Sequence, residues 1–111
     1  MIGLITEDLF FASKVKQVAT DHGTSVELQR QPSPPFAWKQ TPRVVVIDLE
    51  LAQSLVASIV SATRAEFPEA SIVAFAGHAL VDLLSAARQA GCDHVVTRGQ
   101  LEPTVVSLLS T

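Results

Sequence analysis

The chain has 111 residues, of which 48% are hydrophobic and 17% are charged, and its formal net charge is −3. This composition is typical of a folded soluble protein, and the length suits one core, so we expect a single domain over residues 1–111. The eight Lys and Arg residues are scattered, which argues against a basic face that would bind nucleic acid or an anionic membrane.

The sequence also carries signals about location. No apolar run approaches the roughly 20 residues that a membrane-spanning helix needs, and we expect no secretion signal, because no basic segment precedes an apolar one near the start. Cys92 is the only cysteine, which excludes an internal disulfide and fits a reducing compartment. We therefore expect a cytoplasmic protein.

The first elements predicted are a strand and a helix. Residues 2–5 form a short apolar run, which favours a strand. In the helix that follows, Phe11 and Val15 share one face. Asp8 can cap its free amide groups, and Gly23 stands where the helix would stop.

Residues 25–29 then alternate between apolar and polar side chains. The apolar residues, Val26 and Leu28, point one way. The polar residues, Glu27 and Gln29, point the other way. This alternation is typical of an edge strand with one exposed face.

A proline-rich segment follows the edge strand. Its prolines leave room for one or two helical turns at residues 36–40, and we expect Phe36 and Trp38 to anchor it to the sheet. We interpret this segment as a connection within one domain, because the chain on either side is too short to fold alone.

The most informative stretch is the run of β-branched residues in PRVVVIDLE. Residues 44–47 are apolar without alternation, so this strand is predicted to be buried on both faces, in the middle of a parallel sheet. The run ends at Asp48. Ligands of open α/β sheets bind beyond the carboxyl ends of the strands, which makes Asp48 a candidate site residue.

The second half of the chain continues the alternation of helix and strand. The apolar spacing predicts a long helix over residues 51–67, a strand over 71–75, a helix over about 79–90, a short strand over 94–97, and a last helix that starts near Pro103.

Five strands that alternate with helices predict an all-parallel, doubly wound sheet with helices on both faces, in three layers. A Rossmann order would need a glycine-rich turn after the first strand to hold a pyrophosphate, but this turn is Thr6-Glu7-Asp8. We therefore expect the flavodoxin-like strand order 2-1-3-4-5. This order places Glu7, Asp8 and Asp48 in one acidic pocket.

These features together resemble the receiver domain of two-component response regulators. The resemblance covers essentially the whole chain, and its most specific parts are PRVVVIDLE and AGCDHVVTRG. In such domains an Asp at the end of the third strand accepts a phosphoryl group from a histidine kinase. Acids after the first strand bind magnesium, a hydroxyl at the end of the fourth strand holds the phosphoryl oxygens, and a Lys after the fifth strand pairs with them.

The resemblance implies roles for single residues. Asp48 matches the phosphoacceptor, and Arg98 takes the place of the phosphoryl-binding Lys. The implied metal ligands are the side chains of Glu7, Asp8 and Asp48 and the backbone carbonyl of Glu50, which would bind magnesium weakly. The first of the two family acids falls on Thr6.

Two departures concern the switch of the family. The hydroxyl position falls on Ala76, and the aromatic switch position falls on Val95. A ligand without differential contacts in two states cannot shift their balance, so we expect weak phosphorylation at Asp48 or docking of a protein independent of phosphorylation. The implied partners are a histidine kinase or a downstream effector, and we expect a monomer or a weak homodimer.

Alternatives stay open at this stage. Asp48 could simply cap the next helix, and Arg98 could be a structural counter-ion for the acidic residues. A second class of function is a small enzyme or cofactor binder on the same fold, with a metal in the acidic pocket. Against it, the sequence offers no nucleophile with an adjacent base and no phosphate-binding loop, so we expect no enzymatic activity.

Overall fold

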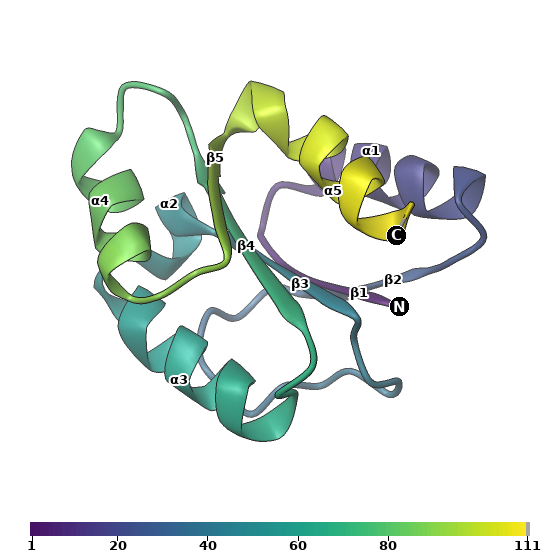
Figure 1. The fold of residues 1–111 in the computed structure, drawn as a ribbon, viewed down its shortest axis with the longest axis horizontal. Coiled ribbons are helices and arrows are strands. Elements are labelled where there is room, and N and C mark those ends of the chain that lie inside the picture. Colours follow the sequence, from purple (N-terminus) through teal and green to yellow (C-terminus); the bar gives the residue numbers. More distant parts are fainter. Residues whose placement is uncertain (111) are drawn as a thin grey trace.

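A five-stranded parallel sheet forms the centre of the protein in a computed structural model, which describes residues 1–110 (Figure 1). The predicted domain extends to Thr111, which lies outside the described residues. The strands are β1 (Ile2–Ile5), β2 (Val26–Gln29), β3 (Val44–Asp48), β4 (Ser71–Ala76) and β5 (His94–Thr97). They lie in the order β2-β1-β3-β4-β5, and every neighbouring pair is parallel. The predicted flavodoxin-like order is therefore confirmed.

Helices cover both faces of the sheet. One face carries α1 (Leu9–Asp21) and α5 (Leu101–Leu109), and the other carries α2 (Leu49–Ala52), α3 (Val56–Glu66) and α4 (Val81–Gln89) (Figure 1). Two 3₁₀ turns, η1 (Gln53–Leu55) and η2 (Arg98–Gln100), complete the chain path. Within residues 1–110, no helix is long and apolar enough to cross a membrane.

The strand β3 contributes to both cores, as its unbroken apolar run predicted. Val44 and Val46 belong to the cluster beneath α1 and α5. Val45 and Ile47 belong to the cluster beneath α3 and α4. All four are at most 1% exposed, so β3 lies in the middle of three layers.

The ends of α1 follow the predicted signals. Asp8 is its N-cap, and the Asp8 side chain accepts a hydrogen bond from the backbone amide of Phe11 at 2.9 Å. Phe11 and Val15 are buried on the face of α1 that packs on the sheet. Gly23 follows the helix with φ = +72°, a conformation that glycine adopts without the steric cost of a Cβ atom.

The edge strand β2 differs from its prediction in one residue. Gln29 was expected on an exposed face, but it is only 6% exposed. Its amide donates hydrogen bonds to the carbonyls of Gln31 and Ser33 and accepts one from the backbone of Ala37. The proline-rich segment therefore folds over Gln29. The Gln29 side chain pairs with backbone groups of that segment that have no partner in a β-sheet.

The helical turns predicted at residues 36–40 are wrong. The Glu27 carboxylate accepts hydrogen bonds from two backbone amides of this segment, so the segment is held to β2 in an irregular conformation. The expected anchoring by aromatic residues does occur. The rings of Phe36 and Trp38 stack with centroids 4.9 Å apart, and both pack against the core beneath α3.

The long helix predicted over residues 51–67 is also wrong, because the chain breaks into α2, η1 and α3. The break is at Gln53, which has φ = +49°, outside the helical region. As a result Leu55, which a continuous helix would place on the same face as Ile59, is 40% exposed. The apolar spacing of the sequence did not reveal this single dihedral angle, although Ile59 and Val60 are buried as a helical period requires.

Candidate functional site

The predicted site residues gather at the carboxyl edge of the sheet, where β1, β3 and β5 end. In the parallel register, Ile5 pairs with Ile47, so the residues that follow these strands lie side by side. A cleft of about 400 Å³ opens there. Its lining contains four acidic residues and one basic residue and consists of Glu7, Asp8, Asp48, Glu50, Leu51 and Arg98.

Asp48 lies at the bottom of this cleft, and both of its carboxylate oxygens are engaged. The residue is 5% exposed. Its Oδ2 accepts a hydrogen bond from the hydroxyl of Thr6 at 2.7 Å, and its Oδ1 accepts one from the backbone amide of Glu50 at 3.0 Å. Asp48 is thus the N-cap of α2, which is one of the two roles that the sequence left open.

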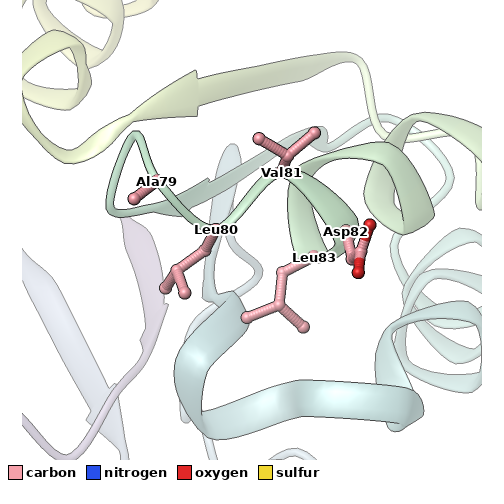
Figure 2. Close-up of a pocket in the computed structure, with 5 residues that line it drawn as sticks. All are labelled: Ala79, Leu80, Val81, Asp82 and Leu83. Carbon is pink, nitrogen blue, oxygen red and sulfur yellow. The ribbon is translucent and has the colours of Figure 1, made fainter.

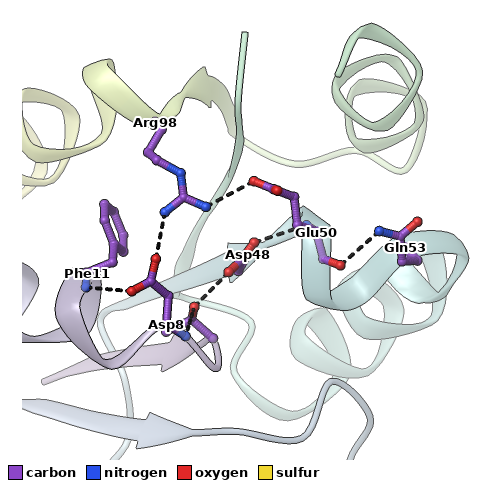
Figure 3. Close-up of polar contacts among 7 residues, drawn as sticks. Asp8, Phe11, Asp48, Glu50, Gln53 and Arg98 are labelled. Carbon is purple, nitrogen blue, oxygen red and sulfur yellow. Dashed lines mark hydrogen bonds and ion pairs between the residues drawn. The ribbon is translucent and has the colours of Figure 1, made fainter. Parts of the chain in front are cut away.

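Asp8 and Glu50 both bind Arg98 (Figure 3). The Nη1 atom of Arg98 lies 3.2 Å from Oδ2 of Asp8, and its Nη2 atom lies 3.0 Å from Oε2 of Glu50. The other oxygen of Asp8 caps α1. A single guanidinium therefore joins the residues that follow β1, β3 and β5, and Arg98 is a counter-ion of the acidic residues.

Two aromatic rings support the guanidinium from the side of the core. Its Cζ atom lies 5.1 Å from the ring centroid of Phe11 and 5.2 Å from that of Phe75, and the two rings stack with centroids 4.7 Å apart. A cation over an aromatic face is attracted by the quadrupole of the ring. Arg98 is thus fixed by two carboxylates and two rings, although its side chain is 36% exposed.

The residues as arranged do not fit a magnesium ion. Among residues 1–110, no group of three or more His, Cys, Asp and Glu side chains could hold a metal ion. The predicted carbonyl ligand of Glu50 accepts a hydrogen bond from the side-chain amide of Gln53 at 2.8 Å (Figure 3). Magnesium requires near-octahedral oxygen coordination, whereas both oxygens of Asp8, both of Asp48 and one of Glu50 already accept hydrogen bonds from protein donors.

The remaining predicted residues take the following places. Glu7 is exposed and lines the mouth of the cleft. Ala76 is the last residue of β4 and is fully buried, and Val95 lies on β5 next to Ala74, half-buried. The neighbour of Ala76 in the register is Thr97, whose side chain caps η2. Their roles as switch positions stay a prediction.

Sequence reasoning missed three residues of the site. Thr6 was noted only as a departure from the family, yet its buried hydroxyl holds Asp48. The parallel register could have revealed this contact, because Thr6 and Asp48 each follow a paired residue. Phe11 was predicted on one face of the first helix and Phe75 at the end of a strand, and no signal in the sequence shows that their rings support Arg98.

Comparisons with known proteins bear on the fold. No protein-family model matches the chain, and no curated protein matches it in sequence. Solved structures do match. The receiver domain of NtrX from Brucella abortus has a TM-score of 0.75 and 17% sequence identity, and the match covers 100% of this chain and 99% of that one.

Two further structures agree. A CheY-like receiver domain from Methanospirillum hungatei has a TM-score of 0.75 at 16% identity, with 98% of this chain and 92% of that one covered. A response regulator from Burkholderia pseudomallei, whose crystal contains a phosphorylated aspartic acid, a calcium ion and citrate, has a TM-score of 0.72 at 17% identity. That match covers 99% of this chain and 66% of the regulator, so the chain spans about two thirds of its length. The chain has the fold of response regulator receiver domains, as its sequence predicted.

Proposed function

We propose that the chain is a receiver-like signal transduction module that docks a protein partner without phosphorylation as its main switch. The observation that carries the proposal is the state of Asp48. The sequence resemblance assigns this residue to the phosphoacceptor position of receiver domains. It is 5% exposed, and its two oxygens accept hydrogen bonds from Thr6 and Glu50. The fold shared with receiver domains supports a signalling role.

Transfer of a phosphoryl group to a carboxylate needs a free oxygen lone pair aligned with the donor. Each oxygen of Asp48 already accepts one hydrogen bond, from the hydroxyl of Thr6 or from a backbone amide, and keeps one lone pair, while the residue is only 5% exposed to a donor. These hydrogen bonds stabilise the free carboxylate and make its oxygens weaker nucleophiles. A hydrogen bond to a charged group contributes about 1.5–3 kcal/mol. Calcium accompanies the phosphorylated aspartic acid in the Burkholderia regulator. The cleft of this chain does not fit magnesium, so we assign no role to a metal ion here.

The residues at the two predicted switch positions also argue against a phosphorylation switch. A phosphoryl group on Asp48 would find no hydroxyl on Ala76, and Val95 offers no aromatic ring that could move with it. Without contacts that differ between two states, a modification cannot shift their balance. Weak phosphorylation of Asp48 would then have little effect on the rest of the domain.

Docking would use the surface of α4, β5 and α5, which lies within residues 79–110. Leu80 and Val81 are 37% and 63% exposed there. They line a hollow of about 210 Å³ together with Asp82 and Leu83 (Figure 2). Exposed apolar side chains beside a carboxylate suit a protein partner, such as an effector or a histidine kinase, that presents apolar residues and one basic residue.

The alternative of a small metal-dependent enzyme receives less support. It depended on a metal in the acidic cleft, and no described group of residues could hold one. We propose a signalling role for the chain in preference to an enzymatic one, with the chain acting as a monomer or a weak homodimer.

Acetyl phosphate with magnesium tests the proposal, read out by intact-protein mass spectrometry. We expect at most a small fraction of the chain to gain one phosphoryl mass that depends on Asp48, with Asp48→Asn as the control variant. The Burkholderia regulator, in which an aspartic acid is phosphorylated, serves as the positive control. Near-complete phosphorylation that is lost in Asp48→Asn would overturn the proposal.

A further inference from the structure

The charges in the acidic cleft are unequal in number. Glu7, Asp8, Asp48 and Glu50 line it, whereas Arg98 is the one basic residue in its lining. A guanidinium keeps its charge at neutral pH and presents its donors in a rigid fork. Arg98 directs the two arms of that fork at Asp8 and Glu50, at 3.2 Å and 3.0 Å (Figure 3).

The position of the guanidinium is set by its surroundings. Its Cζ atom lies 5.1 Å and 5.2 Å from the ring centroids of Phe11 and Phe75, so it packs against two aromatic side chains of the core. The carboxylate of Asp8 is itself fixed by the amide of Phe11, and Glu50 lies in the first turn of α2. These contacts hold the charge in one place, between groups that a divalent ion would otherwise have to bridge.

We propose that Arg98 is the built-in cation of the cleft, taking the place of a divalent metal ion and making the site independent of metals. The importance of this cation for signalling rests on the proposed function. The guanidinium neutralises part of the acidic charge and joins the ends of β1, β3 and β5, which is the structural work that a bound ion would do there. The cost is that the cleft cannot respond to metal concentration.

Thermal unfolding with and without magnesium tests this inference on the full chain. A site with a dissociation constant of about 1 mM would raise the melting temperature by roughly 3–8 °C at about 10 mM magnesium. We expect the wild-type melting temperature to change by less than about 1 °C under these conditions. A clear stabilisation of the wild type by magnesium would overturn the inference.

The variant Arg98→Met removes the charge and keeps a long apolar side chain over the two rings. We expect it to melt at a lower temperature than the wild type without magnesium and to gain several degrees when magnesium or manganese is added. The matched control is Arg64→Met, because Arg64 also forms an ion pair at 3.0 Å and is 37% exposed. That variant should lose stability and gain no response to metal. A folded Arg98→Met variant that ignores both metals would overturn the inference.

A second measurement covers the case in which Arg98→Met does not fold. Paramagnetic Mn²⁺ broadens the amide signals of residues close to it. In the wild type we expect no selective broadening at Asp8, Asp48 and Glu50, and selective broadening there would contradict the inference. Failure of this inference is distinguishable from failure of the proposed function. Metal binding is measured here, whereas phosphorylation is measured in the acetyl phosphate experiment.

Discussion

The two edges of the sheet each carry an arginine that binds an aspartate, and the two clusters differ in what else they contain. At the carboxyl edge Arg98 lies 3.2 Å from Asp8, and at the opposite edge Arg64 lies 3.0 Å from Asp93. Their side chains are similarly exposed, so exposure does not explain the difference.

The Arg64 cluster is balanced and satisfies backbone groups. Arg64 donates to the carbonyls of Ala70 and Gly91, and Asp93 accepts from the backbone amide of Ile72 at 2.7 Å. One positive and one negative side chain thus close the start of β4 and the turn before β5. Such a cluster is fully explained by its contribution to the fold.

The Arg98 cluster has more acidic than basic side chains. Its guanidinium binds two carboxylates, while Glu7 and the buried Asp48 also line the cleft. A surplus of carboxylates at the edge where ligands bind indicates a site, whereas the balanced cluster at the other edge indicates a structural closure. The ratio of acidic to basic side chains in an ion-pair cluster therefore separates the two roles, although the distances within the cluster do not.

The largest expected effect comes from a change in β3, the strand that connects the two edges. Val46→Asp places a charge in β3, the strand that reaches from one edge to the other, at a fully buried position. Burial of an unpaired charge is among the costliest single changes, so we expect a loss of more than about 4 kcal/mol and no cooperative unfolding transition.

The matched control for that variant is Val81→Asp, the same chemical change at a residue that is 63% exposed. Its free energy of unfolding should stay within about 0.5 kcal/mol of the wild type. A cooperatively folded Val46→Asp variant would contradict the central position of β3.

The next effect concerns the carboxyl edge alone. Thr6→Val removes the hydroxyl that donates to the buried Asp48 and should lower the free energy of unfolding by about 1.5–3 kcal/mol in urea titrations. Thr6→Ser keeps the hydroxyl and should lose less. A larger loss in Thr6→Ser than in Thr6→Val would mean that the methyl group of Thr6, and not its hydrogen bond to Asp48, is responsible.

A smaller effect is expected at the opposite edge. Asp93→Ala removes the ion pair with Arg64 and the acceptor of the Ile72 amide, with an expected loss of about 1–2 kcal/mol. Asp93→Asn keeps an oxygen acceptor and should lose less than about 1 kcal/mol. If Asp93→Asn were as costly as Asp93→Ala, the charge and not the backbone contact would dominate this cluster.

The smallest effect concerns the reactivity of the Cys92 thiol and leaves the fold intact at neutral pH. Burial raises the pKa of the Cys92 thiol from 9.0 to about 11, with Arg64 opposing the shift and Asp93 adding to it. The folded state therefore binds this proton more tightly, and its contribution to stability is present below about pH 9 and is lost as the pH rises to about 11.

Alkylation by iodoacetamide at pH 8 measures this shift. The reactive thiolate should be about 100-fold scarcer in the folded chain than in the urea-unfolded chain, so the reaction should be correspondingly slow. Equal rates in both states would show that Cys92 is not protected.

The fold could be predicted from the sequence because its signals are periodic and local. The β-branched run before Asp48 and the alternating strand at residues 25–29 needed only side-chain type and spacing to be assigned. The break at Gln53 was missed because it depends on one backbone angle. The irregular segment at residues 36–40 was missed because its amides bind the Glu27 side chain, which lies far away in the sequence.

The candidate site was predicted to a different extent. The gathering of Asp8, Asp48 and Arg98 at one edge follows from strand order, which the sequence contains. The bonds among them do not, since a carboxylate can bind a cation, a hydroxyl or a helix amide with equal plausibility in sequence. Packing decided in favour of Thr6 for Asp48 and of Arg98 for Asp8.

The most direct test of a cleft without a phosphorylation switch is the change in amide chemical shifts when beryllofluoride and magnesium are added to the ¹⁵N-labelled chain. Beryllofluoride mimics a phosphoryl group on an aspartate. We predict no shifts, or shifts confined to the residues around Asp48. Large cooperative shifts that extend from Asp48 across Ala76 to Val95 would contradict the account and restore an ordinary phosphorylation switch.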